Sequence, residues 1–100
     1  VLFRSLWVVI LNDILDDITL KAVLMRIADN VRRQRKLQKM SQLYLSVEMG
    51  HQSAGLVSFA EAGINNKHFN IEHLATIAKI LDIPIADLFE GVDQILKKSV

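Results

Sequence analysis

The sequence contains no cysteine, a single proline and only four glycines, and these low counts exclude several kinds of protein. Without cysteine the chain cannot form a disulfide, a thiolate nucleophile or a cysteine-ligated metal site. The absence agrees with a reducing compartment, so we expect a cytoplasmic protein. Because glycine and proline are the residues that interrupt helices most strongly, long stretches of this chain are free to be helical.

Long hydrophobic runs are also missing. Residues 6–24 begin as an apolar stretch, but a group of polar and acidic residues interrupts it, namely Asn12, Asp13, Asp16 and Asp17. The remaining run is too short to cross a bilayer. It also lacks the basic start and the small-residue cleavage site of a signal peptide. We therefore expect no membrane partner.

No group of residues has the spacing of a catalytic or metal site. His68 and His73 are five residues apart, which is not the i, i+4 spacing that places two ligands on one helix face. The third histidine, His51, lies far from both in the sequence. Ser58 and Glu61 lack the glycine pattern of a nucleophile elbow. We predict no metal, no cofactor and no enzymatic activity.

Charge is unevenly distributed along a chain whose formal net charge is only +1. Between positions 26 and 39 there are six basic residues and a single acidic one, Asp29. The six are Arg26, Arg32, Arg33, Arg35, Lys36 and Lys39. Such a cluster is either a solvated helix face or a surface for an anionic partner such as a phosphate backbone. We prefer phosphate contact by at least one member.

Apolar residues recur mostly with a helical period, and the alternation typical of strands is weak. The fold class we predict is therefore all-α. The predicted helices span residues 26–38, 42–49, 54–62, 71–81 and 84–89. In the fourth of these, an apolar stripe is formed by Ile71, Leu74, Ile77, Ala78 and Leu81.

Residues with known preferences for helix ends fix these boundaries. Three residues are expected to be N-caps, because their side chains can accept hydrogen bonds from free amides of the first turn; they are Ser41, Ser53 and Asn70. Three glycines are expected to end helices, namely Gly50, Gly63 and Gly91. Pro84 is expected at the first position of the short fifth helix.

The chain divides into three parts on this interpretation. Residues 25–91 form a compact helical domain, and residues 92–100 form a short helical tail. Residues 1–24 are an N-terminal extension of uncertain origin, because Val1 to Ser5 looks like a translated sequencing adapter and Met25 can serve as a start. We favour sequence outside the native coding region over an anchor or docking helix.

Several pieces of the sequence occur in the order of a known family. They are Val31-Arg32-x-x-Arg35, Ser41-Gln42 followed by Leu45, Gly50, Val57-Ser58-x-x-Glu61-x-Gly63, and Leu74-x-x-Ile77-Ala78-x-x-Leu81-x-Ile83. Together they resemble the lambda-repressor-like, Cro-type regulators, also called the xenobiotic-response-element family. The resemblance implies a five-helix bundle with a helix-turn-helix, a homodimer, and sequence-specific regulation of transcription on double-stranded DNA.

The resemblance also implies roles for individual residues. Arg35 and Glu61 match an ion pair behind the recognition helix, which fixes its orientation more than it adds stability. Gln42 would contact a phosphate or an outer base, and Ser53 would cap the recognition helix and touch a phosphate. The positions facing base edges would be Ala54, Gly55, Ser58 and Phe59. The loop that follows would touch the DNA backbone through Lys67 and His68.

The base-facing positions leave a second function open. Arginine, asparagine and glutamine make the bidentate contacts that read bases, and none of them stands at these four positions. Contact with a thymine methyl group or readout of DNA shape remains available. The alternative hypothesis is an antitoxin or protein-interaction module on the same fold, with a protein partner such as a toxin.

Overall fold

Helices provide the regular structure of this protein. The computed structural model describes the backbone of residues 2–98 and the side chains of residues 16–97. Its elements are α1 (Leu2–Leu37), α2 (Gln42–Glu48), α3 (Gly55–Ala62), η1 (Ile64–Asn66), α4 (Ile71–Leu81), η2 (Ile85–Phe89) and α5 (Val92–Lys98), where η marks a 3-10 helix. The predicted all-α class is confirmed, with no strand in residues 2–98. In this same part of the chain no helix is both long and apolar enough for a membrane span.

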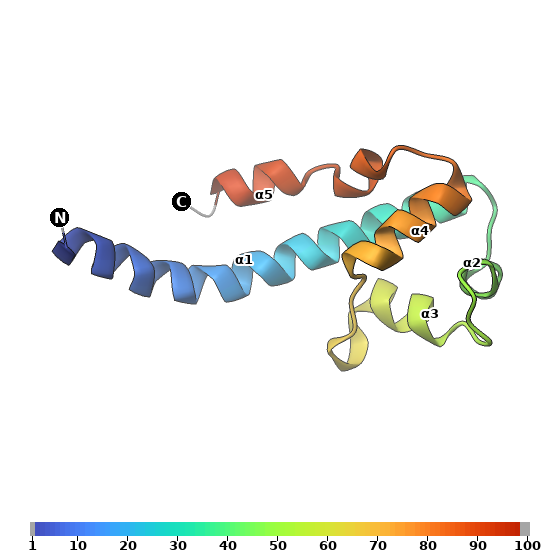
Figure 1. The fold of residues 1–100 in the computed structure, drawn as a ribbon, viewed down its shortest axis with the longest axis horizontal. Coiled ribbons are helices and arrows are strands. Elements are labelled where there is room, and N and C mark those ends of the chain that lie inside the picture. The colour runs from blue at the N-terminus through green and yellow to red at the C-terminus, as the bar shows by residue number, and fades with distance from the viewer. Residues whose placement is uncertain (1, 99–100) are drawn as a thin grey trace.

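The long helix α1 organises the other elements, as Figure 1 shows. α3, α4 and η2 contact α1, and α2 packs against α3 and α4. α5 runs back along α1 towards its N-terminus (Figure 1). The first turns of α1 extend beyond α5, so the molecule is elongated, with extents of 52 × 26 × 18 Å (Figure 1).

The predicted start of the first helix at Arg26 was wrong, because α1 already begins at Leu2. Residues 2–24 contain neither glycine nor proline, and no N-cap residue stands directly before Arg26 to end the helix there. The helix therefore propagates through the predicted boundary between residues 24 and 25. The predicted C-terminal end at residue 38 differs from the observed Leu37 by one residue, which is within the usual uncertainty of helix ends.

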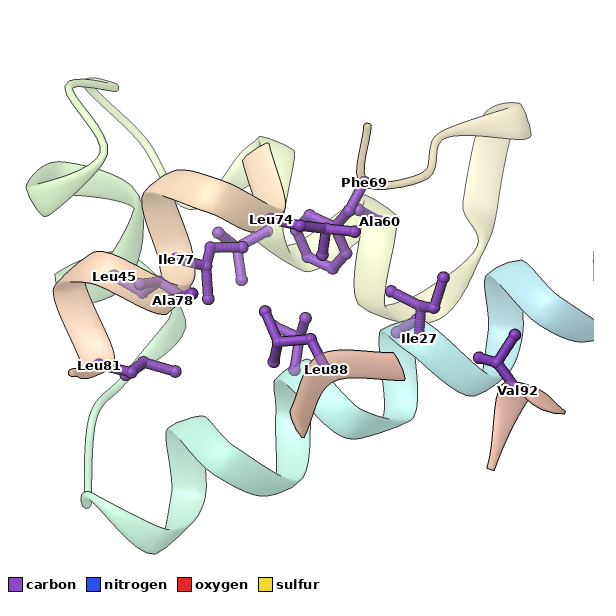
Figure 2. Packing of buried hydrophobic residues seen from close by; sticks show 13 residues of the cluster. Ile27, Leu45, Ala60, Phe69, Leu74, Ile77, Ala78, Leu81, Leu88 and Val92 are labelled. Carbon is purple, nitrogen blue, oxygen red and sulfur yellow. The ribbon is translucent and has the colours of Figure 1, made fainter. Parts of the chain in front are cut away.

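One hydrophobic core joins α1 to α2, α3, α4, η2 and α5 (Figure 2). Its most buried members are Val31, Leu45, Val57, Ile77, Leu81 and Leu88. Burying an aliphatic side chain of this size contributes roughly 1.5–3 kcal/mol, so these residues dominate the stability of the bundle. Phe69, from the loop before α4, is also buried in the core, as Figure 2 shows.

The predicted apolar stripe of α4 is mostly confirmed, because Leu74, Ile77, Ala78 and Leu81 are buried. Ile71 is the exception and remains 67% exposed. It occupies the first position of α4, where the side chain leans towards the N-terminus of the helix and away from the bundle. Ile71 therefore belongs to the stripe by its spacing, but it lies outside the core.

Two of the three predicted N-caps are present. The Ser41 hydroxyl accepts a hydrogen bond from the Tyr44 amide at 2.9 Å, and the Asn70 side chain accepts one from the His73 amide at 2.8 Å. The Asn70 amide in turn donates to Nδ1 of His73 at 3.1 Å, which completes a capping box.

Burial lowers the pKa of His73, and the nearby His51 lowers it further. This side chain is therefore suited to act as a neutral acceptor.

The segment after α4 differs from prediction in its helix type. Pro84 precedes the helix with an extended ψ of 137° and is not its first residue, and Ile85–Phe89 is a 3-10 helix. Side chains of α1 bind the C-terminal end of this 3-10 helix. The amide of Asn30 donates to the carbonyl oxygens of Leu88 and Glu90, at 3.0 and 2.9 Å, and these two bonds satisfy a buried side chain.

Candidate nucleic-acid interface

α2 and α3 form two short helices joined by the turn at residues 49–54. Leu45 of α2 and Val57 of α3 are both fully buried in the common core. The cap at Ser41 fixes the start of α2, and Gly63 ends α3 in the left-handed conformation, as predicted. The pair is therefore attached to the bundle through one side of each helix.

The prediction that Ser53 caps α3 was wrong, because the cap position falls one residue later in the sequence. α3 begins at Gly55, and Ala54 occupies the cap position without a side-chain hydrogen bond. Ala54 adopts a right-handed helical conformation, with φ −76° and ψ −1°, and not the extended one usual for an N-cap. The Ser53 hydroxyl consequently accepts a hydrogen bond from the Gly55 amide at 3.3 Å, which closes a local turn and does not cap the helix.

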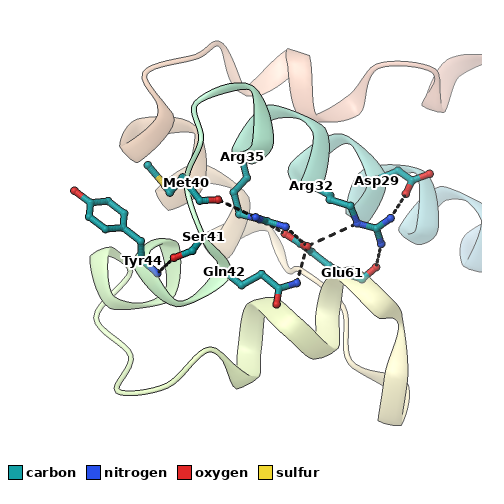
Figure 3. Close-up of polar contacts among 8 residues, drawn as sticks. All are labelled: Asp29, Arg32, Arg35, Met40, Ser41, Gln42, Tyr44 and Glu61. Atoms are coloured by element: carbon teal, nitrogen blue, oxygen red, sulfur yellow. Dashed lines mark hydrogen bonds and ion pairs between the residues drawn. The ribbon is translucent and has the colours of Figure 1, made fainter.

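A bidentate ion pair fixes α3 to α1 from behind, as Figure 3 shows. The guanidinium of Arg35 donates from Nε to Oε2 of Glu61 at 2.8 Å and from Nη2 to Oε1 at 2.9 Å. The side chains are only 8% and 1% exposed. The third guanidinium nitrogen, Nη1, donates to the carbonyl oxygen of Met40 at 2.8 Å, so the charge is well compensated. This is the arrangement that the resemblance implies for these two residues.

Two further side chains complete the surroundings of Glu61 (Figure 3). Gln42 donates from Nε2 to Oε1 of Glu61 at 3.0 Å. Arg32 lies 3.8 Å from the same oxygen and donates from Nη2 to the backbone carbonyl of Glu61 at 3.1 Å. Sequence reasoning assigned Gln42 to DNA and did not place Arg32 here. Contact of Gln42 with DNA stays a prediction, and its amide nitrogen already has a partner within the protein.

The outward side of α3 is open to solvent, whereas its inward side is buried. Val57, Ala60 and Glu61 face the bundle and are no more than 2% exposed. The residues predicted to face DNA lie at or near the other side: Ser53 and Phe59 are exposed, and Ala54, Gly55 and Ser58 are partly exposed. This outward side presents hydroxyl, methyl and aromatic groups without a formal charge.

Lys67 and His68, the remaining predicted contacts, are exposed residues of the loop between η1 and α4. Both line a groove between this loop and α1, together with Lys21 and Leu24 of α1 and Ala60 of α3. The structure thus places them beyond the C-terminal end of α3 and beside α1. Asp17 lines the same groove as Lys21 and Lys67, so the groove carries charges of both signs and adjoins the inward side of α3, where Ala60 lies.

Most arginines of the basic cluster have partners within the protein. Arg32 lies 3.5 Å from Asp29, and Arg33 contacts Glu90 at 2.8 Å. Arg35 forms its ion pair with Glu61, as described above. Lys36 and Lys39 are exposed and form no ion pair within residues 16–97. The sequence count of basic residues therefore overstates the positive charge that is free to meet an external anion.

Comparison with known proteins gives no further guidance, since no protein family, curated protein or solved structure matches this chain. Within the described residues there is also no cluster of three potential metal ligands. The functional argument therefore depends on the geometry of α2, α3 and the residues around them.

Proposed function

We propose that the protein binds double-stranded DNA as a transcriptional regulator, with α2 and α3 acting as a helix-turn-helix of the lambda-repressor type. The observation that carries the proposal is the asymmetry of α3. Its inward side is fixed to α1 through Glu61, and its outward side is open around Ser58 and Phe59. A recognition helix needs both properties, because it must protrude rigidly to enter the major groove.

The lysines nearest to α2 and α3 lie before and after the two helices in the sequence, and neither helix carries a lysine or an arginine. Lys39 precedes α2 and Lys67 follows α3, and both are exposed without an ion pair in residues 16–97. In this proposal both lysines contact phosphates on either side of the groove. Each phosphate that a lysine neutralises adds about −0.9 to the slope of log affinity against log salt concentration.

In this proposal α3 distinguishes one DNA base sequence from another only weakly. Ser58 can exchange hydrogen bonds with base edges, and Phe59, which is 40% exposed, can contact a thymine methyl group. Neither makes a bidentate contact with a base. Discrimination between sites then comes from thymine methyl groups and from the shape of the groove.

Fluorescence anisotropy of a labelled duplex, titrated with protein at several salt concentrations, tests the proposal. We expect Lys67→Gln to reduce the salt slope by about 0.9 for each bound protomer. The matched control is Lys97→Gln, because Lys97 belongs to α5, which lies on the opposite side of α1 from α3 (Figure 1). Absence of any salt-sensitive duplex binding by the unmodified protein would contradict the proposal.

A protein partner is the second candidate function, and the surface of α2 favours it. Leu43, Tyr44 and Val47 are each more than 50% exposed, and between Ser41 and Asn66 the sequence contains no lysine or arginine. Exposed apolar side chains that cluster on one element often mark a protein interface. We expect this surface to bind a toxin-like protein if the chain is an antitoxin.

Co-expression with the product of the adjacent gene, followed by size-exclusion chromatography, tests this alternative. Val47→Asp is expected to abolish the complex. Ile71→Asp, an equally drastic change at an exposed isoleucine of α4, is expected to leave it intact. A complex that survives Val47→Asp would show that α2 is not the binding surface.

A further inference from the structure

The groove between α1 and the loop after α3 has the size of a site for a small metabolite. Its α1 wall consists of residues about one helical turn apart, namely Asp17, Leu20, Lys21 and Leu24. The opposite wall is formed by the end of α3 and by residues 66–68. The groove has a volume of about 270 Å³, just below the range of about 300–1,000 Å³ typical of sites for drug-sized ligands. Only a smaller molecule therefore fits in it.

Apolar side chains form the base and part of the walls of this groove. Ala60 of α3 is only 2% exposed and lies at its base, whereas Leu20 is 56% exposed and Met25 is 39% exposed. Met25 reaches from α1 to Gly63, where an added Cβ atom would lie 2.8 Å from its sulfur atom. The two leucines of the α1 wall and Met25 thus offer apolar surface that a ligand stabilises itself by covering.

The groove also carries charged groups of both signs. Asp17 and Lys21 are four residues apart on the same side of α1, and Lys67 belongs to the opposite wall. None of the three forms an ion pair with any residue in 16–97. Asp17 and Lys21 have the spacing at which helical ion pairs usually form, yet they do not pair with each other. One carboxylate and two ammonium groups are therefore available to a ligand.

A zwitterion with an apolar body matches these groups better than an ion of one sign does. Its ammonium group can pair with Asp17, and its carboxylate can lie between Lys21 and Lys67. Its apolar body then covers Leu20 and lies against Ala60. A simple organic anion in the same place meets the like charge of Asp17, and a simple amine meets the like charges of the two lysines.

We propose that this groove binds a free amino acid with a large apolar side chain. Such a molecule carries its ammonium and carboxylate groups on a single carbon atom, beside the apolar side chain, which is the combination that the groove requires. Lys67 also serves the proposed contact with DNA. The binding of the amino acid is therefore measured in the absence of DNA and does not depend on that proposal.

NMR mapping of the amide signals of the full chain, titrated with L-leucine, L-methionine or L-phenylalanine, tests the proposal. We expect at least one of these amino acids to cause saturable shift changes at Leu24, Ala60 and Gly63. The N-acetylated form of that amino acid lacks the ammonium group, and the corresponding decarboxylated amine lacks the carboxylate. Each is expected to bind several-fold more weakly, because each loses one exposed charge pair.

Replacement of Asp17 tests the assigned orientation of the ligand. Asp17→Asn is expected to weaken binding of the amino acid several-fold but not binding of its N-acetylated form, which has no ammonium group to pair with Asp17. The matched control is Asp16→Asn, because Asp16 is also an exposed carboxylate of α1 but does not line this groove. It is expected to leave the affinity unchanged.

Three results would each overturn the proposal. The first is the absence of saturable shift changes with all three amino acids up to about 10 mM, tenfold above a dissociation constant of about 1 mM. The second is equal binding of the amino acid and its N-acetylated form. The third is an affinity for the amino acid that Asp17→Asn leaves unchanged.

Discussion

Replacement of Glu61 by glutamine is expected to destabilise the protein strongly, because it leaves the charge of Arg35 without its partner. The side chain of Arg35 is 8% exposed, and its guanidinium donates two hydrogen bonds to the carboxylate, at 2.8 and 2.9 Å. A glutamine keeps one acceptor oxygen but turns an amide NH₂ group towards the remaining donors. Breaking a buried ion pair from one side costs about 3–5 kcal/mol.

Urea unfolding followed by circular dichroism measures this cost. A loss of about 3 kcal/mol, at an m-value of about 1.5 kcal/mol/M, moves the midpoint by roughly 2 M. Glu48→Gln is the matched control, because Glu48 of α2 is exposed and forms no ion pair within residues 16–97. A surface change of this kind is expected to stay within about 0.5 kcal/mol of the original.

The double replacement Arg35→Met/Glu61→Leu tests the reasoning more sharply. Apolar residues of similar volume remove both charges at once, so we expect the double variant to be more stable than Glu61→Gln. If Glu61→Gln costs less than about 1 kcal/mol, or if the cost of the double variant equals the sum of the costs of Arg35→Met and Glu61→Leu measured alone, the ion pair does not act as a buried unit.

Three further predictions concern local features. Because the pKa of His73 is lowered in the folded state, the unfolded chain binds more protons near pH 6, and the free energy of unfolding should fall as the pH decreases from 8 to 5. Urea unfolding across this range should show a shallower pH dependence for His73→Gln, and an unchanged one would contradict the assignment. The buried hydroxyl of Ser46 has no hydrogen-bond partner among the described residues, so Ser46→Ala should raise the stability by about 1 kcal/mol, and a loss would show that the hydroxyl is satisfied. Ser41→Ala removes the hydroxyl that caps the Tyr44 amide and should lower the free energy of unfolding by about 1 kcal/mol, as measured by thermal or urea unfolding. No loss of stability would show that water replaces the hydroxyl as the partner of this amide without cost.

The sequence predicted the local features best. Ser41 and Asn70 cap the helices they were assigned to, and Gly63 ends α3, because each of these effects depends on residues only a few positions apart. The periodic spacing of Leu74, Ile77 and Leu81 identified core residues for the same reason. Their positions follow from helix geometry and need no knowledge of the rest of the fold.

Features set by tertiary contacts were less predictable. The sequence contains six basic residues between positions 26 and 39, but only the fold shows that Glu90 and Glu61 pair with three of the arginines among them. Ser53 has the chemistry of an N-cap, yet the helical conformation of Ala54 moves the start of α3 past it. The bonds from Asn30 to Leu88 of η2 and to Glu90 just after it connect residues about sixty positions apart, and no local pattern indicates them.

The most direct test of the central claim is to map the amide signals of the protein by NMR while a duplex is added. α3 is proposed to enter the major groove, so the largest shift changes are expected from Ser53 to Phe59, with smaller ones near Lys39 and Lys67. Amides of α5 are expected to stay unchanged. Shift changes confined to other elements, or none at saturating duplex, would contradict the assignment of α3 as the DNA-reading helix.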